Sequence, residues 1–351
     1  MDIAMSIRRT ITIMVLLVSL SGSCAKWTET QSIEIRKPSL ENNPELYSRY
    51  CQAVRRYKES EHRIMYVTFD NVELPYDQSC NLTSLPDSVD FVEISNPEFS
   101  AQIMEQMSRL RSDKGFGFAV SVSMDAIEAD YKRCIDEIDA EYAESLAAAG
   151  ADASLVPAPE YPDKSGFIED AVNAAFAYID EFGYDAVRVQ YAGHSVSHLT
   201  DEQKEQYTAL QTSFFSMIAD RLEARPSLTY FLCANPEFIV SEDILRAADH
   251  IILPTETSTG TGDFDLFSIQ SEEVLSGMSL LYAVSTITDD LKTGWLTSGE
   301  QIPLVSSWMT IPAEYAKDGM VVLGVRRAFY DDNRNVYRKI RDAIRNMNPN
   351  S

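Results

Sequence analysis

The chain has little positive charge relative to its negative charge. Its 351 residues include 30 lysines and arginines against 54 aspartates and glutamates, a formal charge of −24 at pH 7. Proteins that bind nucleic acids need patches of lysine and arginine to neutralise phosphates, so this balance argues against a nucleic-acid partner. The same charge disfavours anionic ligands but is compatible with neutral ones.

Several motifs of well-known sites are also missing. No Cys-x-x-Cys pair is present, which argues against a structural zinc site. The run Thr257–Gly262 contains no Gly-Lys pair of a phosphate-binding loop, and no Gly-x-Ser-x-Gly elbow of a serine hydrolase occurs. His194 and His198 are four residues apart, but no Glu follows His194 as a zinc-protease motif requires, and the pattern indicates a loop. We predict no cofactor and no metal.

Long hydrophobic runs are absent apart from one near the N-terminus. Arg8 and Arg9 precede the apolar run Ile11–Leu20, and small residues then lead to Cys24. This order is typical of an export signal, and the run is too short to span a bilayer as a permanent helix. A cysteine after small residues resembles a bacterial lipoprotein box, although Leu20 lies one place further from it than usual.

The export signal predicts how the chain is divided. We expect residues 1–23 to be a signal peptide, residues 24–42 a polar tether and residues 43–351 one folded domain. Cys24 would be lipidated and anchor the protein in the membrane. Ordinary cleavage and secretion is the alternative.

The other cysteines are expected to be structural. Cys134 lies in a helical pattern and Cys233 in a strand pattern, so both are expected to be buried. A disulfide between Cys51 and Cys80 could form after export, but the sequence does not decide it.

Eight short apolar runs alternate with helical patterns along the rest of the chain. The predicted strands are Ile64–Phe69, Val89–Ile94, Phe116–Val122, a short strand from Val187, Leu228–Cys233, Ile251–Leu253, Leu280–Ile287 and Met320–Val325. The predicted helices cover residues 44–60, 99–112, 126–149, 167–179, 201–222, 244–248 and 333–346. This alternation predicts an α/β fold, a single-domain (β/α)8 TIM barrel. An open doubly wound sheet is the alternative.

The fourth strand carries the most informative stretch. Gly183 ends a helical pattern, and a short apolar strand with polar residues follows. The spacing of Asp185, Arg188, Gln190 and Ala192 resembles the Asp-x-x-Asp-x-Asp-x-Glu motif of family-18 glycoside hydrolases, but only Asp185 fits.

The resemblance to family 18 covers nearly the whole mature chain. The sequence is similar to the lipoprotein endo-β-N-acetylglucosaminidase-like branch of Bacteroides-type bacteria. The stretches that carry the similarity are Asn43–Tyr47, Phe69–Asn71, Pro86–Asp90, Tyr184–Ala186 and Tyr337–Pro349. The family implies a TIM barrel whose active site lies at the carboxyl ends of the strands.

The resemblance also implies a role for each motif position. In active relatives the final Glu protonates the glycosidic oxygen, and the last Asp orients the substrate's own 2-acetamido group for attack. Here Ala192 takes the place of the acid, Gln190 that of the orienting Asp, and Arg188 replaces a buried carboxylate with a permanent cation. General acid catalysis alone contributes roughly 10²–10⁴ in rate. We therefore predict loss of this hydrolysis, whereas sugar binding depends less on these groups.

Other carboxylates near strand ends offer an alternative catalytic pair, with Glu256 and Glu93 as the best candidates. Their other expected role is to bind sugar hydroxyls or to pair with Arg188 or Arg327. The remaining carboxylates of this kind are Asp70, Asp125, Glu237, Asp331 and Asp332.

Aromatic side chains near the presumed binding face could stack on sugar rings, although core packing is the commoner role for each. Tyr330 and Trp308 are the preferred stacking residues; Tyr191, Phe329 and Trp295 are the others. The full predicted ligand-binding set is Asp70, Gln190, Tyr191, His194, Asn235, Glu256, Trp308, Arg327 and Tyr330.

The sequence thus predicts a non-catalytic glycan-binding lipoprotein on the outer-membrane surface. Its ligand would be an oligosaccharide containing N-acetylglucosamine, of the N-glycan type, captured for outer-membrane glycan-uptake proteins. One alternative is an active endo-β-N-acetylglucosaminidase or chitinase-like enzyme that uses displaced carboxylates. Another is a scaffold without sugar affinity.

Overall fold

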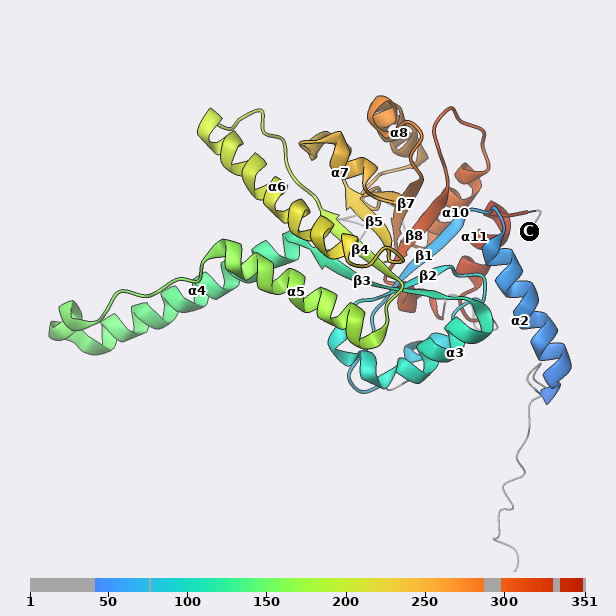
Figure 1. Ribbon diagram of the computed structural model, residues 1–351, viewed down its shortest axis with the longest axis horizontal. Coiled ribbons are helices and arrows are strands. Elements are labelled where there is room, and N and C mark those ends of the chain that lie inside the picture. The colour runs from blue at the N-terminus through green and yellow to red at the C-terminus, as the bar shows by residue number, and fades with distance from the viewer. Residues whose placement is uncertain (1–41, 76, 287–297, 331–334, 350–351) are drawn as a thin grey trace, which may run out of the picture. The chain divides into compact units, whose positions relative to one another are not determined.

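Eight parallel strands close into a barrel in chain order (Figure 1). β1 pairs with both β2 and β8, and Ile64 lies opposite Gly319 where the ring closes. The closed ring confirms the predicted (β/α)8 TIM barrel and excludes the open doubly wound sheet. The strands are β1 (Ile64–Phe69), β2 (Phe91–Ile94), β3 (Gly117–Ser123), β4 (Ala186–Tyr191), β5 (Thr229–Ala234), β6 (His250–Leu253), β7 (Leu280–Ser285) and β8 (Gly319–Leu323).

This computed structural model describes residues 42–75, 77–286, 298–330 and 335–349. Some predictions concern residues outside these ranges and stay predictions. They are the signal peptide (1–23), the lipidation of Cys24, the tether up to residue 41, the strand end at Ile287, and the roles of Trp295, Asp331 and Asp332.

Helices surround the strands (Figure 1). The α-helices are α2 (Pro44–Glu59), α3 (Met104–Lys114), α4 (Met124–Ala149), α5 (Lys164–Phe182), α6 (Asp201–Glu223), α7 (Glu242–Arg246), α8 (Thr261–Leu275), α10 (Ser298–Met309) and α11 (Arg338–Met347). Short 3-10 turns are η2 (Gln78–Cys80), η3 (Leu82–Ser84), η4 (Pro97–Gln102), η5 (Gly150–Leu155), η6 (Pro236–Phe238) and η7 (Val325–Ala328). None of the helices in the described ranges is long and apolar enough to cross a membrane.

Two helix boundaries show what the sequence did and did not signal. Gly183 ends α5 in the left-handed conformation, with φ 63°, as its position predicted. Helix α8 was not predicted, because Gly260 at its N-cap has no side chain that could cap it.

Alternation along each strand divides the buried residues into two layers. Met65 and Val67 point outward and pack beneath the helices, whereas Tyr66 belongs to a smaller cluster inside the barrel. That inner cluster consists of Tyr66, Ala119, Ala186, Phe231, Cys233, Ile252, Leu281, Ala283 and Val321.

Aromatic rings fill the barrel interior. The ring of Phe231 lies 5.0 Å from that of Tyr66 and 5.0 Å from that of Phe91, both edge-on. Phe91 in turn covers Gly117, where a Cβ atom would lie 2.6 Å from its ring, so no side chain fits there. In the part of the chain that the structure describes, these rings pack the interior below the cavity at the carboxyl ends of the strands.

The cysteines in the described part of the chain carry free thiols. Cys51, Cys80 and Cys233 are buried, and Cys134 is half-buried because its helix is only partly covered. The two cysteines that could have formed a disulfide after export, Cys51 and Cys80, are therefore unpaired in this structure.

Candidate functional site

A cavity of about 240 Å³ opens at the carboxyl ends of the strands. Strands β1, β2, β4, β5, β7 and β8 contribute its walls, together with residues directly after β2, β4 and β6. This is the end of a TIM barrel at which active sites form. Its lining residues are Thr68, Glu93, Ser95, Arg188, Gln190, Ala192, Cys233, Ala234, Pro254, Glu256, Ala283 and Leu323.

Three of the four motif positions line this cavity. They are Arg188, Gln190 and Ala192, which occupy every second position of β4 and the residue after it. All three therefore point toward the inside of the barrel. Asp185 lies before β4, at the opposite end of the strand. Its Oδ2 atom accepts hydrogen bonds from the backbone N–H of Phe118 at 2.9 Å and from Nη2 of Arg111 at 2.8 Å. Asp185 therefore anchors β3 and α3 and does not contribute to the cavity.

The cation of Arg188 is paired inside the barrel. Its Nη2 donates to Oε1 of Glu93 at 3.0 Å, and its Nε lies 2.7 Å from Oε2, a charge contact without hydrogen-bond alignment. Tyr66 donates its hydroxyl to the same carboxylate at 2.8 Å. Burial disfavours the charged guanidinium, but Glu93 and the other acidic groups around it together outweigh this effect and raise the pKa of Arg188 above its usual value. Glu93 therefore pairs with Arg188, which is one of the roles that the sequence left open.

A carboxylate also lies beside Ala192. The backbone N–H of Ala192 donates to Oδ2 of Asp125 at 3.0 Å. Asp125 occupies the first turn of α4, whose N-terminus Ser123 caps by accepting from the N–H of Ala126 at 3.2 Å. The Ala192 methyl group has no proton to transfer, so Asp125 is the acidic group next to this position.

Glu256 presents a second carboxyl group to the cavity. Its Oε2 atom is buried and has no hydrogen-bond partner among the residues that the structure describes. Burial raises the pKa of this carboxyl group, while its own backbone N–H and Arg188 act in the opposite direction. Gln301 donates to the backbone oxygen of Glu256 at 3.1 Å and accepts from the N–H of Ser285 at 2.7 Å, which fixes the loop after β6.

The aromatic residues predicted to stack on sugars occupy different environments. Tyr191 points outward and packs against Phe215 of α6, with ring centroids 5.5 Å apart. Trp308 is 4% exposed and donates its Nε1–H to Asp265 at 2.7 Å. Both rings therefore belong to the layer between strands and helices. Tyr330 follows the η7 turn after β8, is 66% exposed and lies outside the cavity lining.

The other predicted ligand residues also lie outside the cavity lining. Asp70 accepts from Arg326 through its backbone oxygen, and Asn235 caps η6 by accepting from the N–H of Glu237 at 3.2 Å. Arg327 is exposed. His194 is exposed in the predicted loop, with its ring 4.6 Å from that of Tyr207. In the described ranges, no three His, Cys, Asp or Glu side chains are grouped as metal ligands.

Of the predicted ligand-binding residues, the structure thus brings together Gln190 and Glu256. Thr68 and Ser95 also line the cavity and were not among the predicted residues. Thr68 shares the inner face of β1 with Tyr66, so strand alternation could have identified it. Ser95 directly follows β2, the place where barrel sites receive loop residues.

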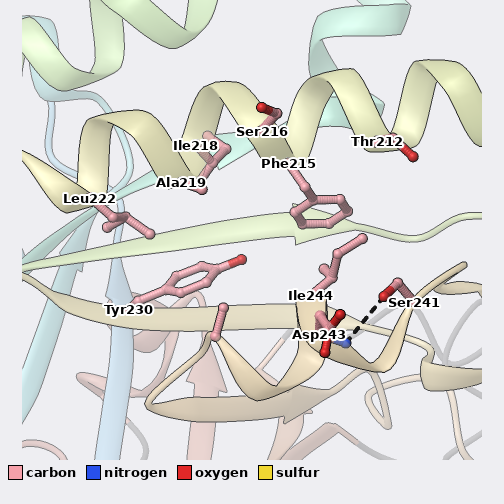
Figure 2. Close-up of a pocket in the computed structure, with 11 residues that line it drawn as sticks. Thr212, Phe215, Ser216, Ile218, Ala219, Leu222, Tyr230, Ser241, Asp243 and Ile244 are labelled. Carbon is pink, nitrogen blue, oxygen red and sulfur yellow. Dashed lines mark hydrogen bonds between the residues drawn. The ribbon is translucent and has the colours of Figure 1, made fainter.

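A second cavity, of about 460 Å³, lies between α6, β5 and α7 (Figure 2). Its walls are mostly apolar, and Asp243 is the one carboxylate that lines it. The backbone N–H of Asp243 is capped by Oγ of Ser241 at 3.2 Å. Because this cavity lies outside the barrel and its walls are mostly apolar, the site is assigned to the smaller cavity in the mouth.

Comparisons with known proteins agree with this geometry. The sequence profile of glycoside hydrolase family 18, BT1044-like, matches residues 28–282. A solved structure of a selenomethionine variant of BT1044 superposes with a TM-score of 0.56 at 14% identity, covering 89% of this chain and 96% of that one. A GH18 chitinase from Pseudoalteromonas aurantia superposes with a TM-score of 0.52 at 11% identity, covering 81% of this chain and 100% of that one. No sequence among curated proteins matches.

Proposed function

We propose, from the premise that this chain belongs to glycoside hydrolase family 18 of the BT1044-like type, that it binds an oligosaccharide in the barrel mouth without hydrolysing it. The observation that carries the proposal is the content of β4. Arg188, Gln190 and Ala192 line the cavity at the spacing of the family's carboxylates.

The chemistry of these residues supports binding over hydrolysis. Ala192 cannot protonate a leaving group, and the Arg188 cation is held by Glu93 at 2.7 Å. Without a general acid, a reaction of this type loses roughly 10²–10⁴ in rate. Substrate-assisted attack also needs a carboxylate that stabilises the developing charge, which the neutral amide of Gln190 does not provide.

The ligand that we propose contains N-acetylglucosamine, as in an N-glycan. The Gln190 amide can hydrogen-bond an acetamide group, and Ser95 adds a hydroxyl to the same cavity. A volume of about 240 Å³ is below the roughly 300–1,000 Å³ of pockets for drug-sized ligands, so the cavity suits about one sugar residue. The rest of the oligosaccharide would extend over the loops around the mouth.

The cellular setting is part of the same proposal. Lipidation of Cys24 would anchor the protein at the outer-membrane surface, where it would hand glycans to outer-membrane uptake proteins. The support for this setting is the sequence of the first 24 residues.

Calorimetric titration with chitin oligosaccharides and N-glycans, beside a hydrolysis assay on the same sugars, tests the proposal. We expect binding without cleavage, and an affinity reduced at least tenfold in Gln190→Ala. The matched control is Gln206→Ala, an exposed position on α6, which should bind like the wild type. Cleavage of any of these sugars, or absence of binding to all of them, would refute the proposal.

One observation favours an alternative function. The Oε2 atom of Glu256 is buried without a hydrogen-bond partner among the described residues, and burial raises the pKa of the carboxyl group, as a general acid requires. A displaced-acid glycosidase would cleave the sugars above and would lose that cleavage in Glu256→Gln.

A further inference from the structure

The carboxyl group of Glu256 has an unused hydrogen-bonding position inside the mouth. Its Oε2 atom is buried and contacts no donor in the part of the chain that the structure describes. The cation in the cavity does not satisfy it, because Arg188 gives its close charge contacts to Glu93, at 2.7 and 3.0 Å. For a charged carboxylate buried in this way, the loss of hydration is only partly compensated by its own backbone N–H and by Arg188.

The groups around Glu256 favour its neutral form. Among the residues that the structure describes, Arg188 on β4 is the one cation that acts on it, and Arg188 is balanced by Glu93 on β2. The Cys233 thiol on β5 is neutral, since burial raises its pKa to about 12, and it interacts with both Glu256 and Asp125. The Tyr66 hydroxyl is committed to Glu93. The mouth therefore holds more acidic groups than basic ones, and burial raises the pKa of Glu256 further.

A neutral carboxyl group offers what a carboxylate lacks, an O–H donor. Sugars present many acceptor oxygens, and an acetamide carbonyl is the strongest acceptor on the ligand proposed above. We infer that the sugar residue in the barrel mouth accepts a hydrogen bond from the protonated carboxyl group of Glu256, so that binding takes up a proton. This inference rests on the proposed function and adds to it that low pH strengthens binding.

The test is calorimetric titration of chitotriose between about pH 5 and pH 8, in two buffers with different ionisation enthalpies. The wild type should take up protons on binding, and its affinity should fall as pH rises, approaching tenfold per pH unit above the pKa. Glu256→Gln keeps an N–H donor but cannot titrate. It should bind at every pH about as tightly as the wild type does at the lowest pH of the series, with no proton uptake.

Glu237→Gln is the matched control, because Glu237 is an exposed carboxylate after the neighbouring strand β5. This variant should keep the pH dependence of the wild type. Binding whose affinity does not change with pH, or a Glu256→Gln variant that still takes up protons, overturns the inference and leaves the proposed function standing. Absence of binding at every pH overturns both.

An infrared measurement separates the protonation state from ligand affinity. The complex of the wild type with chitotriose should show the C=O band of a buried neutral carboxylic acid, and the complex of Glu256→Gln should lack that band. If the two complexes have the same spectrum in this region, Glu256 is ionised in the complex and is not the donor, which also overturns the inference.

Discussion

The ion pair between Arg188 and Glu93 yields a quantitative prediction about stability. Glu93 is 2% exposed and Arg188 is 9% exposed, so both charges have lost nearly all their hydration. Replacing Glu93 with Gln preserves the shape of the side chain and an acceptor for Tyr66 but leaves the guanidinium charge uncompensated. Removing one partner of a buried pair typically costs about 3–5 kcal/mol. We expect Glu93→Gln to lower the free energy of unfolding by that amount.

The assay is urea denaturation followed by circular dichroism at neutral pH. The matched control is Asp136→Asn, which makes the same change of carboxylate to amide in an exposed ion pair. Its partner is Lys132, and the Lys132 and Asp136 side chains are 74% and 61% exposed. An exposed pair contributes about 0.3–0.5 kcal/mol, so the control should unfold almost like the wild type.

A double variant tests the reason for the loss. Combining Arg188→Met with Glu93→Gln removes the stranded charge, and we expect it to recover at least half of the lost stability. The reasoning is refuted if Glu93→Gln costs less than about 1 kcal/mol, or if the double variant is no more stable than Glu93→Gln alone.

Three further predictions concern single ionisable groups. The pKa of Glu256 is raised in the folded state, so the folded state holds this proton to higher pH than the unfolded state does. Stability therefore falls as pH rises from the unfolded pKa to the folded pKa of this group. Glu256→Gln should have a higher melting temperature than the wild type at about pH 8 and the same melting temperature at about pH 4. Burial lowers the pKa of Lys58 from 10.5 to about 7. Between these values the unfolded state binds one more proton than the folded state, so the free energy of unfolding rises with pH. Urea titrations at several pH values should show that Lys58→Met removes this rise; the same dependence of stability on pH in this variant would contradict the prediction. Asp185→Asn weakens the half-exposed ion pair with Arg111 and the hydrogen bond from the Phe118 N–H. It should lower the free energy of unfolding by about 1 kcal/mol, measured by urea titration, and leave sugar affinity unchanged. Weaker sugar binding would contradict the assignment of Asp185 as a structural anchor.

The strands were predictable because each is buried on both faces and appears in the sequence as a short apolar run. Ile64–Phe69 was predicted to the residue. Helix α8 was missed because a glycine precedes it, and glycine gives no capping signal. The start of a helix is visible in the sequence only where a side chain caps the first backbone N–H groups.

The site was only partly predictable, because direction matters as much as position. Gln190 and Tyr191 are neighbours at the end of β4, but alternation turns Gln190 into the cavity and Tyr191 toward α6. Trp308 was chosen for its residue type, yet its contacts come from α8 and β7, far from it in sequence. The pairing of Arg188 with Glu93 spans 95 positions, so it became definite only once β2 and β4 were placed in one ring.

The aromatic packing of Tyr66, Phe91 and Phe231 also bears on the kinetics of binding. These rings fill the interior beneath the mouth, so no open channel runs through them. A ligand must therefore leave by the path through which it entered. The protein therefore cannot pass a sugar through itself. Transfer to another protein would have to follow release into solvent, or occur while the outer end of the ligand still projects from the rim. The dissociation rate would limit the rate of the first route.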